Sequence, residues 1–217
     1  MKKGGNVKKS ILLFCVALLL GAGGIAEALL IQNGSFEAMG ASESGEEILF
    51  LGDTRITGWN VGSGSIGYFQ STPGNSSIDM NGVGPGTLSQ TFVTADLTLP
   101  YEAIFFLEAN PFEPNLNKDL EVSVLDSSGG VDFSDVFTIT PTEKEWTLFS
   151  FTFLATSAQT TLTFKSLATG FYGAALDDVQ VNLANGGGAP VPEPATMLLL
   201  GFGLMGMAFV GRRKFLK

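Results

Sequence analysis

Apolar and polar residues alternate along several short segments in the middle of the chain. In residues 120–124, 149–153 and 162–164, leucine, valine or phenylalanine occupies every second position, and polar residues lie between them. A period of two places the apolar side chains of a strand on one face and the polar ones on the other. Between residues 29 and 183 we find no convincing apolar period of 3.6 residues, so the pattern predicts strands there.

The segment 101–107 differs because apolar residues occupy both of its faces. Tyr101, Ala103, Phe105 and Leu107 lie on one face, with Ile104 and Phe106 on the other. This pattern predicts an inner strand that is covered on both sides. Turn-forming residues recur about every 8 to 12 positions, as in sandwiches, and residues 38–47 and 110–118 read as loops. We therefore predict an all-β domain over residues 29–184, a β-sandwich or jelly roll with most of the 18 phenylalanines in its core.

The first 28 residues have the composition of a secretory signal peptide. Four lysines come first, the apolar stretch Ile11 to Leu20 follows, and Ala26-Glu27-Ala28 forms an A-x-A cleavage site. We expect a signal helix that is cleaved after Ala28, so residues 1–28 are absent from the mature protein. An uncleaved N-terminal anchor is the alternative.

The C-terminal segment combines an apolar run with a basic tail. A glycine-rich linker, residues 185–190, leads to an uncharged stretch at 195–211, and Arg212, Arg213 and Lys214 follow in the tail 212–217. A helix over the uncharged stretch would span roughly 25 Å, near the short limit for crossing a bilayer core. The basic tail predicts a transmembrane helix with its C-terminal end in the cytoplasm. A buried helix of a soluble core is the alternative.

The order of these C-terminal features resembles a PEP-CTERM sorting segment, which we assign to residues 191–217. Val191, Pro192, Glu193 and Pro194 precede the apolar run, and Arg212 and Arg213 follow it. The resemblance implies that an exosortase, an integral-membrane enzyme, processes the chain near the Pro-Glu-Pro motif. It further implies membrane anchoring before processing, then a cell-surface or extracellular location, in the setting of a Gram-negative exopolysaccharide or biofilm matrix.

Charge is distributed unevenly along the 217 residues. The chain has 12 basic and 21 acidic residues, and each terminal segment (1–28 and 190–217) holds four basic residues and one glutamate. The region between them therefore has 4 basic and 19 acidic residues, a net charge of −15. Such a domain repels nucleic acid and anionic lipid but attracts cations.

Two residue types that carry much of enzyme chemistry are missing from the exported domain. The chain has no histidine, and its one cysteine, Cys15, lies in the predicted signal peptide. This excludes Ser-His-Asp and Cys-His catalysis, zinc sites with histidine or thiolate ligands, and disulfide bonds in that domain.

Several ordered motifs of the domain resemble galactose-binding-like jelly rolls, and more closely the choice-of-anchor C family. They are N-G-S-F-E at 33–37, G-W-x-V-x-S-G-S at 58–65, I-D-M-N-G-x-x-P-G-x-L-S-Q-T-F at 78–92, T-L-T-F-x-S-L at 161–167 and L-D-D-V at 176–179. The resemblance implies a structural calcium ion held between the first and last strands by Glu37 and Asp177, with Asp178 beside them. The alternative is that Glu37 is solvated and that the two aspartates discourage strand-edge aggregation.

Aromatic side chains are the candidates for carbohydrate binding, because sugars present C–H faces to aromatic rings and hydroxyl groups to polar neighbours. We assign this role to Trp59, Tyr68 and Tyr172. Trp146 is a further candidate, and Gln70, Asp79 and Asn81 are candidate polar neighbours. The alternative, which we favour for both tryptophans, is a place in the core.

Carboxylate pairs remain the only route to catalysis, as in glycoside hydrolysis. Asp177 and Asp178 are adjacent in a strand and should point to opposite faces, so we expect that they cannot flank one bond. The sequence thus predicts a non-catalytic, exported surface protein associated with exopolysaccharide. A carbohydrate-binding module with a specific glycan ligand is the first alternative, and a carboxylate-based polysaccharide hydrolase is the second.

Overall fold

The computed structural model describes residues 30–39, 46–72, 75–110, 116–140 and 145–184. Within these ranges the chain forms eleven β-strands and no helix. The strands are β1 (Glu46–Phe50), β2 (Asn60–Ser63), β3 (Ser65–Thr72), β4 (Asn75–Asp79), β5 (Thr87–Val93), β6 (Tyr101–Ala109), β7 (Lys118–Leu125), β8 (Val131–Ile139), β9 (Thr147–Phe153), β10 (Gln159–Ser166) and β11 (Ala174–Leu183).

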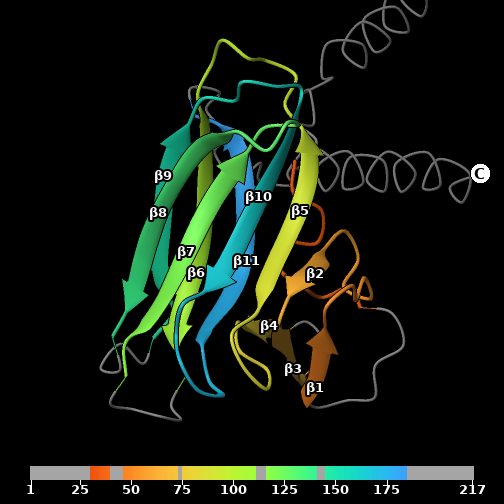
Figure 1. Ribbon diagram of the computed structural model, residues 1–217, viewed down its shortest axis with the longest axis vertical. Helices are drawn as coiled ribbons and strands as arrows, with labels where there is room; N and C mark the ends of the chain where they lie inside the picture. Colours follow the sequence, from red (N-terminus) through yellow and green to blue (C-terminus); the bar gives the residue numbers. More distant parts are fainter. Residues whose placement is uncertain (1–29, 40–45, 73–74, 111–115, 141–144, 185–217) are drawn as a thin grey trace, which may run out of the picture.

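The strands form two antiparallel sheets that lie face to face. The six-stranded sheet has the order β1-β3-β4-β11-β6-β9, and the five-stranded sheet has the order β2-β5-β10-β7-β8. Figure 1 shows β5, β10, β7 and β8 as one layer over β11, β6 and β9. The all-β sandwich predicted from the alternating segments is therefore confirmed, and the three segments with period two are parts of β7, β9 and β10.

Phenylalanine rings fill the space between the sheets. Phe105 of β6 is fully buried, and its ring centroid lies 5.3 Å from that of Phe164 of β10 and 5.2 Å from that of Phe137 of β8. Both ring pairs cross from one sheet to the other with their planes nearly perpendicular, an arrangement that aromatic rings favour. Burial of a side chain of this size contributes about 1.5–3 kcal/mol, so these rings stabilise the contact between the layers.

The prediction that β6 is covered on both sides is wrong in one respect. β6 does lie inside its sheet, between β11 and β9, and its residues at odd positions from Tyr101 to Ala109 are buried. However, Ile104 and Phe106 are only half-buried, because the second sheet packs against one face alone. The outer face of the six-stranded sheet therefore presents apolar surface to solvent.

An N-terminal turn closes the sheet where β4 stops pairing with β11. β4 pairs with β11 only at Ala175 and Leu176, and beyond that point the N–H of Val179 donates to the carbonyl of Gly34 at 2.9 Å. A Cβ on Gly34 would lie 1.9 Å from the Val179 carbonyl oxygen, so only glycine allows this approach. The turn thus joins the beginning of the domain to its last strand.

The same turn is held to the five-stranded sheet. The side-chain amide of Gln90 on β5 accepts from the N–H of Gln32 at 2.6 Å and donates to the Gln32 carbonyl at 2.8 Å, so it acts as a backbone partner would. The indole N–H of Trp59 donates to the Asn33 carbonyl at 3.0 Å. These bonds explain why the N-G-S-F-E and G-W motifs occur together: they build one structural junction.

The predicted signal peptide with Ala26 and Ala28, the linker 185–190 and the sorting segment 191–217 lie outside the described residues. Among the residues that are described, no helix is long and apolar enough to cross a bilayer.

Candidate functional site

A β-bulge in the last strand brings two carboxylates together. The pairing of β11 with β6 shifts register between Asp177 and Gln180, and Asp178 adopts a φ of 51°. A non-glycine residue in this left-handed region carries a strain of about 1–3 kcal/mol and is most frequent at functional sites. Asp177 and Asp178 line the same recess. Our expectation that they point to opposite faces is therefore wrong, because it assumed a regular strand.

This recess lies on the outer face of the six-stranded sheet and has a volume of about 230 Å³. Its lining consists of Phe106, Trp146, Asp177 and Asp178. Phe106 on β6 is the register partner of Asp177 on one side and of Leu148 on the other. Trp146, just before β9, is 40% exposed, and Leu148 is 56% exposed. The site, which we call the outer-face recess, thus combines aromatic walls with carboxylates.

The described lining of the recess carries two carboxylates and no basic side chain. Burial, followed by the charges of Asp178 and Glu37, raises the pKa of Asp177 to about 6, although a hydrogen bond from the Asp178 N–H opposes the rise. Burial also raises the pKa of Glu108 on the same face of β6. At neutral pH Asp177 is still mostly ionised. The carboxylates of the site can therefore accept hydrogen bonds from hydroxyl groups and attract cations.

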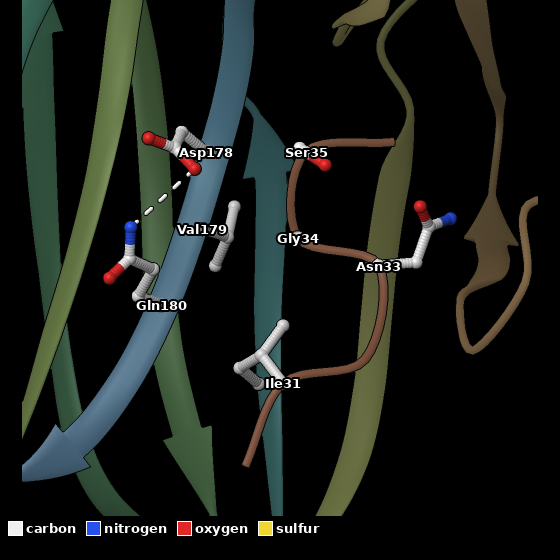
Figure 2. Close-up of a pocket in the computed structure, with 7 residues that line it drawn as sticks. All are labelled: Ile31, Asn33, Gly34, Ser35, Asp178, Val179 and Gln180. Atoms are coloured by element: carbon white, nitrogen blue, oxygen red, sulfur yellow. Dashed lines mark hydrogen bonds between the residues drawn. The ribbon is translucent and has the colours of Figure 1, made fainter. Parts of the chain in front are cut away.

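Asp178 also borders a second recess of about 250 Å³ between β11 and the N-terminal turn (Figure 2). Figure 2 shows the Asn33 side chain directed away from β11, while Asp178 and Gln180 lie 3.5 Å apart, Oδ1 to Nε2. The Asn33 amide bonds the backbone of Ala38 and Thr57. The polar groups of Asn33 thus hold the turn, and the polar side chains of Ser35, Asp178 and Gln180 line the second recess.

The predicted calcium ligands are only partly brought together. The charge of Glu37 acts on Asp177, but both Glu37 carboxylate oxygens accept hydrogen bonds from Ser76, at 2.8 Å from its N–H and 3.1 Å from its hydroxyl. Among the described residues, no group of three or more acidic, histidine or cysteine side chains is close enough to share a metal ion. Calcium takes about six to eight oxygens, so an ion here would need backbone carbonyls, and the calcium site stays a prediction.

Two of the three predicted sugar-binding aromatics are core residues. Trp59 is 2% exposed and packs against Phe36 with ring centroids 5.3 Å apart. Tyr68 is 1% exposed, and its hydroxyl donates to the Phe36 carbonyl and bonds the Ser76 hydroxyl. Their assignment to a ligand site is therefore wrong, and the core position that we favoured for Trp59 is confirmed. The indole N–H of Trp59 and the hydroxyl of Tyr68 donate to backbone carbonyls inside the sandwich. The alternation of apolar and polar residues in the sequence does not reveal such hydrogen bonds.

The other two aromatic candidates lie near the surface. Tyr172 is half-buried in the connection before β11, where its carbonyl accepts a 2.7 Å hydrogen bond from the Lys118 ammonium. Trp146 is exposed, which corrects our preference for a core position. The charged residues around Trp146, in the E-K-E-W sequence at 143–146, were the available signal that it faces solvent.

A buried polar cluster occupies the end of the sandwich near Tyr172. Asp79 is 2% exposed, and its Oδ1 accepts from the N–H groups of Asn81 and Gly173 at 2.8 and 2.7 Å, while Oδ2 accepts from the Asn110 amide at 2.6 Å. Burial raises the pKa of Asp79 to about 6, but these bonds and the buried Lys118 ammonium oppose the rise. The cluster ties loops together, so Asp79 and Asn81 do not serve as sugar contacts.

Family models match two parts of the chain. Residues 29–182 match a family described as a protein of unknown function, DUF642. Residues 190–214 match the PEP-CTERM protein-sorting motif, which confirms the resemblance found in the sequence.

A curated relative, halomucin of Haloquadratum walsbyi (strain DSM 16790 / HBSQ001), is 30% identical over 193 residues, which is 80% of this chain. The chain spans only 2% of that protein.

Solved structures share the fold at low identity. An arabinose-bound α-L-arabinofuranosidase is 15% identical with a TM-score of 0.52, over 74% of this chain and 27% of the enzyme. A CBM4 module is 20% identical with a TM-score of 0.46, over 70% of this chain and 99% of the module. The family match covers most of the described sandwich, so this chain belongs to the DUF642 family and carries a PEP-CTERM sorting motif at its C-terminal end.

Proposed function

We propose that this protein is an exported, non-catalytic surface protein that binds extracellular polysaccharide through the outer-face recess. The observation that carries the proposal is the recess itself, where the exposed Trp146 and the half-buried Phe106 lie beside two carboxylates. An aromatic ring packs against the C–H face of a sugar, and carboxylate oxygens accept hydrogen bonds from its hydroxyl groups. The long, open sheet face suits a polymer better than a small molecule.

The sorting motif supports export and processing. An exosortase is the proposed processing partner, acting near Val191 to Pro194, with the apolar run and Arg212-Arg213 holding the chain in the membrane before cleavage. The signal peptide with cleavage after Ala28 completes this route. The domain between the two ends would then face the outside of the cell.

Replacing Trp146 by alanine is expected to lower polysaccharide affinity at least about 10-fold. The substitution removes ring stacking on the sugar, and a loss of about 1.4 kcal/mol of binding free energy raises the Kd tenfold. The measurement is affinity electrophoresis of protein recovered from the cell envelope, against a panel of neutral, anionic and amino-bearing polysaccharides. The intact mass of the same sample locates the cleavage points. We expect loss of residues 1–28 and cleavage near the sorting motif.

Phe50→Ala is the matched control, because Phe50 is 55% exposed on β1, the opposite edge of the same sheet. Equal affinities of Trp146→Ala and Phe50→Ala would rule out the recess as the binding site. An intact mass that still includes both ends would rule out the processing.

A hydrolase is the second candidate, since Asp177 and Asp178 line one recess and burial raises the pKa of Asp177 to about 6, as suits a general acid. Two features favour binding. The recess is open to solvent, and Oδ1 of Asp177 is held by the Asp178 N–H at 2.6 Å. Release of reducing ends from any polysaccharide of the panel, abolished by Asp177→Asn, would favour the hydrolase instead.

If a structural calcium ion binds at Glu37 and Asp177, the melting temperature is expected to be several degrees higher in saturating calcium than in EDTA. A ligand that binds only the folded state stabilises that state by about 2.7 kcal/mol when the ligand concentration is 100 times the Kd. Differential scanning calorimetry in the two buffers measures the shift. Glu37→Gln should abolish the shift, and identical melting curves of the unmodified protein would refute the calcium site.

A further inference from the structure

Among the described residues that line the outer-face recess, none has a positive side chain. In the described part of the chain there are three basic residues, and each has another partner. Arg55 pairs with Asp53 and Glu47, Lys165 lies 3.0 Å from Glu121, and Lys118 is buried at the Tyr172 carbonyl. A uronic-acid polymer would therefore meet two carboxylates and no described counter-charge at this site.

The shape of the recess limits which cations fit. Phe106 and Trp146 provide apolar walls, so a ligand that fills the site needs a carbon surface as well as positive charge. A protonated amino sugar has both on one ring, because its C–H face can pack on an aromatic ring while its ammonium group reaches a neighbouring carboxylate. Aromatic rings also attract ammonium groups directly.

We propose that the outer-face recess is specific for polysaccharides with free amino groups, and that Asp177 and Asp178 bind the ammonium group while Trp146 and Phe106 pack against the sugar ring. This inference rests on the proposed polysaccharide binding and names its substrate class. Burial, and after it the charges of Asp178 and Glu37, raises the pKa of Asp177, and no described basic residue opposes the rise.

The test compares two probes that differ only in the substituent on the sugar nitrogen. Chitosan oligosaccharides carry free amino groups, and chitin oligosaccharides of the same length carry uncharged N-acetyl groups. Isothermal titration calorimetry of the mature protein is run in EDTA, so that no divalent ion occupies the carboxylates. We expect the amino-bearing probe to bind at least about 10-fold more tightly. This preference should fall as salt rises from about 0.1 M to about 1 M, because the Debye length shrinks from about 10 Å to about 3 Å.

Asp177→Asn is expected to remove the preference while the N-acetylated probe binds as before, since an asparagine oxygen can still accept from the Asp178 N–H. Asp135→Asn is the matched control. It removes one charge from an exposed position of β8, on the other sheet, and should leave the preference intact. Circular dichroism confirms that both variants fold.

The two proposals fail in different ways. If both probes bind with equal affinity and Trp146→Ala weakens the binding of both, the amino-sugar specificity is overturned but the proposed polysaccharide site is supported. Tighter binding of polygalacturonate than of chitosan would also overturn the specificity. Binding that neither Trp146→Ala nor Asp177→Asn affects would overturn both proposals.

Discussion

Replacing Asp79 by alanine is expected to destabilise the domain by about 3–5 kcal/mol, because it breaks a buried charged network by removing one partner. The substitution removes the carboxylate that accepts hydrogen bonds from the N–H groups of Asn81 and Gly173 and from the Asn110 amide. It also removes a negative charge that acts on Lys118, a residue that is 1% exposed. For a domain of this size, 1 kcal/mol corresponds to about 2–4 °C, so we expect the melting temperature to fall by roughly 10 °C.

Asp96→Ala is the matched control for this experiment. The Asp96 carboxylate also accepts hydrogen bonds, from the N–H and the hydroxyl of Thr98 and from the N–H of Leu99, but it lies at the surface and bonds only residues two or three positions away. Thermal unfolding of the two variants is monitored by circular dichroism. The comparison separates the effect of burial on stability from the effect of losing one charge. If both variants melt at the same temperature, the buried cluster contributes nothing special to stability.

Gly34→Ala is expected to destabilise the domain by at least about 3 kcal/mol, at the upper end of what overpacking usually causes. The new Cβ would lie 1.9 Å from the Val179 carbonyl oxygen and 2.9 Å from its carbonyl carbon. Both are backbone atoms of β11, which is hydrogen-bonded to β6 along its other edge and cannot shift easily. The turn must therefore move away, and the bond from the Val179 N–H to the Gly34 carbonyl is lost.

Gly84→Ala tests whether the close approach, rather than the loss of a glycine, causes this effect. A Cβ on Gly84 would meet no atom within 4 Å, and its φ is not in the left-handed region. We expect the free energy of unfolding of the Gly84→Ala protein, measured in urea, to equal that of the unmodified protein or to be slightly higher. The reason is that alanine lowers the conformational entropy of the unfolded chain. A Gly34→Ala protein as stable as Gly84→Ala would show that the turn does not depend on this contact.

Local alternation was enough to predict the sandwich. The polar residues between Phe149, Phe151 and Phe153 placed β9 on a half-buried sheet, and the structure has it there. The pattern of β6 misled us because it does not say how many layers a sheet has. Ile104 and Phe106 look like core residues in sequence, yet they lie on the outer face, since only one other sheet exists among the described residues to cover β6.

The candidate site was harder to predict, because it depends on a departure from regular geometry. Asp177 and Asp178 were singled out, but the bulge that places both in one recess arises from a register shift and a positive φ that no local pattern encodes. Tyr68 was misassigned because its hydroxyl finds a backbone acceptor inside the protein. The indole N–H of Trp59 does the same, which agrees with the core position that we favoured for it. Phe106 was missed altogether as a site residue, since it reads as core.

The position of β11 determines how the domain would respond to mechanical tension. β11 is the last strand that the structure describes, it precedes the linker and the sorting segment in the sequence, and it lies between β4 and β6 rather than at an edge. A pull on the C-terminal end would act along this strand, so its bonds to β6 would have to break together in shear instead of peeling apart one by one. Under the proposed binding, a drag force on the polymer would pass partly along β11 through Asp177 and Asp178, and partly through Phe106 on β6 and Trp146 before β9.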